Sequence, residues 1–194
     1  MEIGATKAVQ DRLKTTKIEE SKGASLVFCW DTHLTKIKGR NVLFIVNASN
    51  RYITAMTDIE PRNWNYYTMY IRSVIQGVMQ EMGYSEDQIG QYFKMSGDTT
   101  VTKTHGRKSV GGINRMVMDA QYFGKKLEKE AKYQWELSEY LNRDICQPEG
   151  FDAYGYPSEL FKLDMERLGI AAKRKPAKVI DFAQYIENNR GTND

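Results

Sequence analysis

The segment TTVTKTHGRKSVGGINRM, residues 99–116, gathers the side chains of this chain best suited to contact a phosphate group. Lys103, Arg107 and Lys108 supply positive charge, and an arginine guanidinium can bind two oxygens at once. The glycines that follow predict a helix start, whose free N–H groups favour an anion. The pattern of a P-loop is absent. We therefore predict a phosphate-contacting edge at 102–108; the alternative is a solvated loop with ordinary surface charge.

The two histidines, His33 and His105, are the side chains here that titrate near neutral pH without perturbation. A ribonuclease that works without a metal needs a base, an acid and a cation beside the phosphate. If the strands that carry them are neighbours, His33 and His105 would act as base and acid, in an order that the sequence leaves open. Lys103 and Arg107 would bind the phosphate. The alternative is that each histidine is structural or solvated.

Carboxylates and thiols give no sign of a metal centre. The acidic residues are scattered, without the clustered carboxylates of a metal nuclease. Asp31 lies two places before His33, so the two side chains would share one face of a strand. Cys29 and Cys146 belong to no CxxC motif or Cys/His cluster. We expect no metal, no cofactor, and two unpaired thiols in a reducing cytosol.

Further polar and aromatic residues extend the predicted nucleic-acid surface. The aromatic-rich segments NWNYYTMYIR and YFGKKLEKEAKYQW suit stacking on RNA bases, protein interfaces, or buried helix faces. The basic run KRKPAK suits a nucleic-acid backbone or a plain linker. The predicted nucleic-acid contacts beyond the candidate catalytic residues are Asn47, Arg51, Thr104, Lys108, Asn114, Lys173, Arg174 and Lys175.

The elements that must position these residues predict an α+β fold. Antiparallel strands are expected at 26–33, 41–47 and 52–58, with turns rich in Gly and Asn between them, and another strand at 99–104. The apolar run VLFIV predicts a central strand. Helices are expected at 7–20, at 65–82, at 85–97 after the cap Ser85, over a long stretch at 110–141, and after the cap Ser158.

Length and charge limit the function classes. The 194 residues fit one α+β domain at 1–168, followed by a basic linker and a short helix at 169–194. The net charge is +3, so an anionic partner must be met by a local patch. The N-terminus lacks the apolar run of a signal peptide, and no stretch has the length of a membrane span, which favours a cytoplasmic protein.

The chain resembles an uncharacterised domain family of small bacterial, plasmid and phage proteins. The residues that carry the resemblance, in this order, are ATK (5–7), Trp30, Leu34, Asn47, Arg51, the TKT of 102–104, Arg107, Asn114 and the YPSELF segment. The family usually has a histidine directly after the tryptophan and an asparagine two places later, where this chain has Asp31 and His33. The family name implies no activity.

The resemblance to mobile-element proteins directs the functional hypothesis. Some proteins of this size on mobile elements are anti-CRISPR proteins, and a few of those truncate the guide RNA. The first hypothesis is therefore an RNA-directed protein that binds or cuts RNA, with a CRISPR guide as one target. The second is a non-enzymatic inhibitor that covers the surface of a protein such as a CRISPR effector, and the third is a small-molecule or nucleotide binder.

Overall fold

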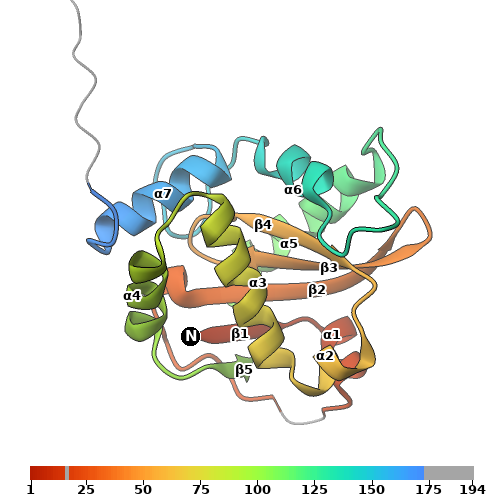
Figure 1. The fold of residues 1–194 in the computed structure, drawn as a ribbon, viewed down its shortest axis with the longest axis horizontal. Helices are drawn as coiled ribbons and strands as arrows, with labels where there is room; N and C mark the ends of the chain where they lie inside the picture. The colour runs from red at the N-terminus through yellow and green to blue at the C-terminus, as the bar shows by residue number, and fades with distance from the viewer. Residues whose placement is uncertain (16–17, 173–194) are drawn as a thin grey trace, which may run out of the picture.

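A computed structural model of the chain describes residues 1–15 and 18–172. The predicted α+β class is confirmed: one five-stranded sheet, in the order β4-β3-β2-β1-β5, lies between two groups of helices (Figure 1). The strands are β1 (Glu2–Ala5), β2 (Cys29–Ile37), β3 (Arg40–Asn47), β4 (Ile53–Thr57) and β5 (Thr100–Thr102). A short 3-10 turn, η1 (Leu26–Phe28), precedes β2.

The predicted antiparallel meander is confirmed for β2, β3 and β4. Trp30 pairs with Asn47 at one end of the first hairpin, and Val46 pairs with Ile53 in the second. The first turn has left-handed backbone at Lys38 and Gly39, with φ of 50° and 82°, which matches the twist of a tight hairpin. The apolar run of β3 is buried on both faces between β2 and β4, as its composition predicts.

The sheet is mixed rather than wholly antiparallel, which corrects the sequence-based prediction. The N-terminal residues form β1, a strand that the sequence analysis missed, and β1 runs parallel to both β2 and β5. Gly4 pairs with Asp31 on one side and with Thr102 on the other. The predicted strand at 99–104 therefore joins the sheet, but through β1 rather than through the meander.

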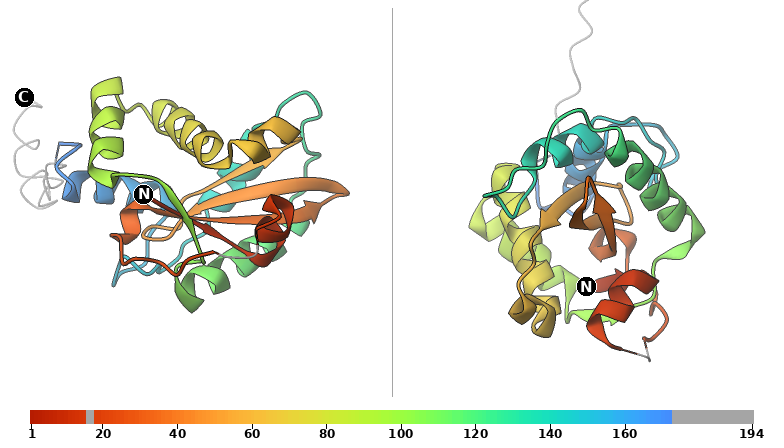
Figure 2. Two further views of the ribbon diagram at one scale, coloured as in Figure 1. Left: turned by 90° about the horizontal axis from the view of Figure 1, so that it is seen from below. Right: turned by 90° about the vertical axis from the view of Figure 1, so that its right-hand side faces the viewer.

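Two helical layers cover the sheet (Figure 2). Trp30, Ile71 and Phe161 belong to the larger core, under the layer made of α2 (Pro61–Asn65), α3 (Tyr67–Glu81), α4 (Glu86–Ser96) and α7 (Pro157–Arg167). Phe44 and Ile113 belong to the core on the opposite face, under α5 (Gly106–Gln121) and α6 (Trp135–Asn142). Alternate residues of each central strand enter the two cores in turn.

The predicted long helix at 110–141 is wrong, because the chain leaves the helix at Tyr122 and forms α6 separately from Trp135. The intervening segment instead hydrogen-bonds to the outer edge of β4. The Thr57 N–H donates to the Lys132 carbonyl at 2.7 Å, and the Gln134 N–H donates to the Ala55 carbonyl at 2.9 Å. Covering an exposed sheet edge in this way satisfies backbone groups that a continuous helix would leave to solvent.

Helix boundaries agree in part with the predictions. Ser85 forms the capping box of α4 with Gln88, and Gly97 ends that helix, as expected. Ser158 is not the cap of α7, because Tyr156 holds that position and Pro157 occupies the first turn. The N-terminal helix α1 (Lys7–Leu13) is shorter than the predicted 7–20.

The second predicted segment, 169–194, with its basic linker and last helix, lies almost wholly outside the described residues. Lys173, Arg174 and Lys175 are among the residues that are not described. Within 1–15 and 18–172, none of the helices has the length and the apolar content needed to cross a membrane.

Candidate functional site

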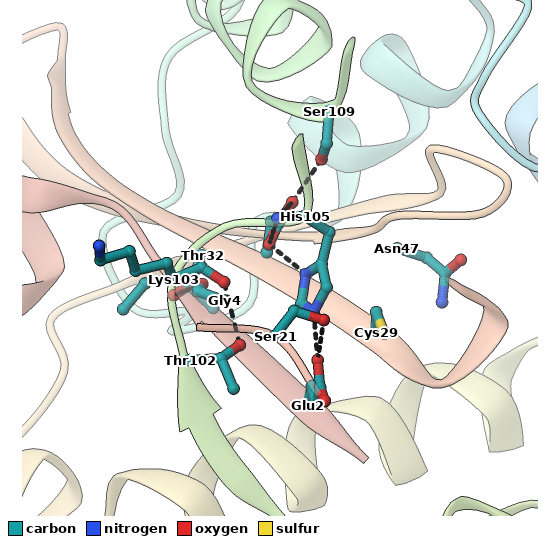
Figure 3. A network of polar contacts seen from close by, with 12 residues as sticks. Glu2, Gly4, Ser21, Cys29, Thr32, Asn47, Thr102, Lys103, His105 and Ser109 are labelled. Atoms are coloured by element: carbon teal, nitrogen blue, oxygen red, sulfur yellow. Dashed lines mark hydrogen bonds and ion pairs between the residues drawn. The ribbon is translucent and has the colours of Figure 1, made fainter. Parts of the chain in front are cut away.

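A buried polar cluster lies where β1, β2 and the start of α5 meet (Figure 3). Its members are Glu2, Asp31, His105 and Ser109. The exposed fractions of the side chains of His105, Glu2 and Asp31 are 2%, 5% and 0%. Charged groups are rarely buried so completely unless they are paired, so the pairing within this cluster decides what it can do.

The strand register brings the cluster together. Glu2 lies beside Cys29, and Gly4 lies beside Asp31, on the two parallel strands β1 and β2. Because side chains alternate along a strand, all four positions face α5, while Ile3 and Trp30 enter the opposite core. His105 follows β5 as the N-cap residue of α5, so the first turn of this helix points at the same place.

Hydrogen bonds satisfy both oxygens of Asp31. The backbone N–H of His105 lies 3.2 and 3.3 Å from the two carboxylate oxygens, and the ring Nδ1 of His105 lies 2.7 Å from Oδ1. The hydroxyl of Ser109 donates to Oδ2. Asp31 therefore links β2 to the first turn of α5 through backbone, ring and hydroxyl donors at once.

Glu2 binds the other side of the His105 ring. Its Oε2 lies 3.0 Å from the ring Nε2. Glu2 also accepts hydrogen bonds from the Ser21 hydroxyl at 2.6 Å and from the Lys22 backbone N–H at 2.8 Å. The segment around Ser21 and Lys22 thus covers the cluster from the side of β1.

With a carboxylate at each ring nitrogen, His105 is held as an imidazolium. Burial by itself lowers the pKa of His105, but the hydrogen bonds and charges of Asp31 and Cys29 outweigh it and raise this pKa to about 10. Burial acts to raise the pKa of Glu2, but its hydrogen bonds to Ser21, Lys22 and His105 lower it overall. The cluster is a charged network whose ion pairs are kept near neutral pH.

Gly4 leaves the room that the Asp31 carboxylate occupies. A methyl group at Gly4 would lie 1.8 Å from Asp31 Oδ1 and 3.0 Å from the Cα of Thr104. Gly4→Ala is expected to lower the free energy of unfolding by about 1–3 kcal/mol, because Asp31 is fixed by its hydrogen bonds and cannot move aside freely. Urea unfolding measures this.

The matched control for that substitution is Gly90→Ala on α4, where an added methyl group meets nothing within 4 Å. Alanine has a higher helix propensity than glycine. Gly90→Ala is therefore expected to raise the free energy of unfolding by up to about 1 kcal/mol. Equal effects of the two substitutions would contradict the close packing of Asp31 against β1.

The proposed catalytic pair is not favoured by this geometry. Both ring nitrogens of His105 face carboxylates, so the ring is poorly suited to exchange a proton with a substrate near neutral pH. His33 is half-buried on β2, with its Nδ1 3.2 Å from the Thr6 hydroxyl, and burial lowers its pKa. Asp31, expected beside His33, has His105 as its partner. The catalytic roles stay a prediction.

The predicted phosphate contacts lie around the start of α5, outside the buried cluster. Lys103 is exposed and pairs with Glu20. Arg107 is exposed and forms no ion pair with any residue of 1–15 or 18–172. Lys108 is exposed and donates to the Pro148 carbonyl at 3.2 Å. Thr104 is half-buried, and Asn114 is exposed about two turns along the helix.

Arg51 reaches the same helix from the other hairpin. Its backbone is left-handed, with φ of 63°, and its guanidinium lies against Gly112, where a methyl group would be 2.6 Å from the Arg51 Nε. Arg51 borders a surface cleft of about 330 Å³ beside α5. Other residues that line this cleft are Arg115, Asp119, Asp144, Gln147 and Tyr154.

Asn47 lies near Arg51 and Lys108, but it is buried and so is not itself exposed to a ligand. Its side chain is buried, and its amide donates to the Val27 carbonyl at 2.9 Å while its oxygen accepts from the Ser49 and Asn50 N–H groups. These bonds shape the loop that carries Arg51, so Asn47 acts on the surface through the loop. Cys29 and Cys146 are both buried free thiols, as expected.

Three residues that form or cover the cluster were missed by the sequence analysis: Glu2, Ser21 and Ser109. No spacing connects them, because they come from β1, a loop and α5. The available signal was the pair of charged residues inside apolar surroundings, Glu2 in MEIGA and Asp31 in VFCWDT. A buried charge predicts a partner, although the sequence alone does not say which one.

Comparison with known families decides the relationship of the chain. Residues 2–160 match a family described as a domain of unknown function, DUF6933. The chain belongs to this family. All members of the buried cluster, and the exposed residues at the start of α5, lie within the matched part of this DUF6933 protein.

The DUF6933 description carries no activity, so function must be argued from the residues. No curated protein matches the chain significantly. The same holds for solved structures. The anti-CRISPR origin expected from the sequence stays a hypothesis.

Proposed function

We propose that this DUF6933 protein binds single-stranded RNA along the surface where α5 begins. The observation that carries the proposal is the gathering of cations there, of which Lys103, Arg107 and Lys108 are exposed and Arg51 is half-buried. Arg107 and Lys108 occupy the first turn of α5, Lys103 precedes it, and Arg51 lies against its second turn at Gly112. Cations at one edge are what a phosphate backbone requires, because the chain as a whole has a net charge of only +3.

Arg107 is the strongest contact on this surface. It has no competing carboxylate among the described residues, whereas Lys103 is paired with Glu20 and Arg115 with Asp119. An unpaired guanidinium can bind two phosphate oxygens without first breaking an ion pair. The N–H groups of the first turn of α5 add partial positive charge beside it.

The cleft beside α5 gives a place for a base. Tyr154, which is 72% exposed, lines this cleft together with Arg51 and Arg115. Stacking on an exposed aromatic ring, with arginine nearby, is how sequence-tolerant proteins hold single-stranded bases. A strand that runs from Arg107 past Gly111 to this cleft would meet cations first and an aromatic ring second.

We propose that the protein binds RNA and does not cut it. The buried cluster holds the β5–α5 junction and so fixes the loop that presents Lys103, Thr104 and Arg107. His105 contributes to this support through its bonds to Asp31 and Glu2, and its ring has no free nitrogen for a substrate. The role of the cluster in RNA binding is therefore to position the surface.

The test is a titration of labelled RNA with the purified protein, read by fluorescence anisotropy at several salt concentrations. The probes are an unstructured oligonucleotide and a CRISPR guide RNA. Arg107→Ala combined with Lys108→Ala is expected to weaken binding about tenfold or more. The plot of log affinity against log salt has a negative slope, and this slope should become shallower by about 0.7 for each phosphate contact removed.

Lys94→Ala is the matched control, because Lys94 is exposed on α4 in the opposite helical layer. It should leave affinity and salt slope nearly unchanged. No binding at low salt, or equal losses in the control and the double variant, would overturn the proposal. Cleavage that persists with chelator and disappears in His33→Ala would instead favour the ribonuclease hypothesis.

A further inference from the structure

The buried cluster and the neighbouring Cys29 bring three different metal-ligand types close together. Oxygen of Glu2, sulfur of Cys29 and nitrogen of His105 all lie within 4.8 Å of one another. They come from three elements, β1, β2 and the N-cap of α5, and all three side chains are buried. The set is therefore assembled by the fold, and no spacing in the sequence reveals it.

The ligand atoms lie close enough for a tetrahedral zinc ion to bind after small shifts of the side chains. Bonds of about 2.0–2.2 Å to nitrogen and oxygen and about 2.3 Å to sulfur place tetrahedral ligand atoms about 3.3–3.6 Å apart. Glu2 Oε2 and His105 Nε2 are 3.0 Å apart, so they would separate by a few tenths of an ångström. Figure 3 shows the Cys29 sulfur on the side of the ring where Glu2 lies.

Asp31 occupies the position of an outer partner. It accepts a hydrogen bond from the Nδ1 side of the His105 ring at 2.7 Å, which leaves Nε2 directed at Glu2. Histidine ligands of metals commonly donate their second ring N–H to a carboxylate, which fixes the tautomer and the ring orientation. The ring of His105 is thus already aimed, with Nε2 toward the other two ligands.

We propose that Glu2, Cys29 and His105 bind a zinc ion, with Asp31 as the partner that orients His105. The fourth position would be filled by water or by the hydroxyl of Ser21, which lies 2.6 Å from Glu2 Oε2. A zinc ion here joins β1, β2 and α5 and would stabilise the junction that carries the basic loop. The site is independent of the RNA proposal, since neither Arg107 nor Lys108 contributes to it.

The full chain, stripped of metal with a chelator, is titrated with zinc alone by calorimetry and then with cobalt alone by absorption spectroscopy. We expect one zinc ion per chain. Cobalt should give a thiolate-to-metal charge-transfer band in the near ultraviolet. Thermal unfolding should shift upward when zinc is added.

The matched pair of variants is Cys29→Ser and Cys146→Ser, because both cysteines are buried and free. Cys29→Ser should abolish the charge-transfer band and weaken zinc binding by more than about tenfold, because loss of an outer-shell partner alone costs about 10–100-fold. Cys146→Ser should keep both signals. Circular dichroism shows whether each variant is folded, and Glu2→Gln provides a second ligand variant if Cys29→Ser is not.

Two results would overturn the proposal. One is a wild-type protein that binds no zinc at a stoichiometry of one. The other is a zinc or cobalt signal that is the same in wild type, Cys29→Ser and Glu2→Gln. RNA binding is measured separately on wild type and on Cys29→Ser, so failure of the zinc site and failure of the RNA surface can be told apart.

Discussion

Asp31→Ala is expected to lower the free energy of unfolding by about 3–5 kcal/mol, the largest loss from any single substitution in the cluster. The carboxylate lies between the His105 backbone N–H, the His105 ring and the Ser109 hydroxyl, all buried. Without it, these donors lose their acceptor and the imidazolium keeps one carboxylate instead of two. A typical domain is stable by about 5–15 kcal/mol, so this loss is a large part of the total.

Urea unfolding of wild type and Asp31→Ala measures the effect. Ser109→Ala removes one donor of the same network and should cost about 1 kcal/mol. Asp152→Ala is the matched control, because Asp152 is exposed in the loop before α7, and its effect should stay within about 0.5 kcal/mol. A loss in Asp31→Ala no larger than that of the control would show that the cluster does not hold the β5–α5 junction.

The elements that could be predicted from the sequence are those with local signals. The β2–β4 meander has alternation, an apolar central strand and turn residues such as Gly39, and it forms as predicted. The helix α4 has its cap Ser85 and its stop Gly97 within 13 residues of sequence, and it also forms as predicted. In each case the residues that fix the structure lie close to one another in the chain.

The misses share the opposite property. The strand β1 has four residues, and its partners Cys29 and Thr100 are far from it in sequence. The break between α5 and α6 depends on hydrogen bonds from 132–134 to β4, more than 70 residues earlier. The helical pattern of 110–141 contains no information about the unpaired edge of β4. For this reason the sequence predicts one long helix there.

The candidate site divides in the same way. The exposed cations Lys103, Arg107 and Lys108 were predicted from their spacing, because residues close in sequence at a strand end stay close in space. The pairing of His105 with Asp31 and Glu2 was not predicted, because it depends on the parallel register of β1 and β2. The sequence therefore predicts the group of exposed cations, and the fold is needed to identify the charged network beneath it.

The second large effect concerns pH: the free energy of unfolding of the metal-free protein should fall as pH rises from about 6.5 to about 10. In the unfolded chain His105 loses its proton above its ordinary pKa of 6.5, whereas in the folded chain it keeps the proton until about pH 10. Between these two pH values the folded state binds more protons than the unfolded state. The stabilisation from His105 is therefore complete below the unfolded-state pKa and is lost as pH rises through the folded-state pKa.

The slope across this window should approach 1.4 kcal/mol per pH unit at most, about 3–5 kcal/mol in total. The hydrogen bonds and charges that raise the pKa of His105 come from Asp31 and Cys29, and Glu2 contacts the Nε2 side of the ring. Urea unfolding of chelator-treated protein at several pH values across the window measures the slope. His105→Asn should remove most of it, because the titrating ring is gone.

His33→Asn is the matched control. Burial lowers the pKa of His33, so the pH dependence that this residue gives to the free energy of unfolding has the opposite sign. The stabilisation from His33 is lost as pH drops below 6.5, where the unfolded chain gains the proton first. His33→Asn should therefore leave the slope between neutral pH and pH 10 unchanged. If His105→Asn does not fold, an NMR titration of the His105 ring in wild type decides the matter directly. A ring that loses its proton near pH 6.5 would mean that the two carboxylates do not hold an imidazolium, and the charged network described above would be wrong.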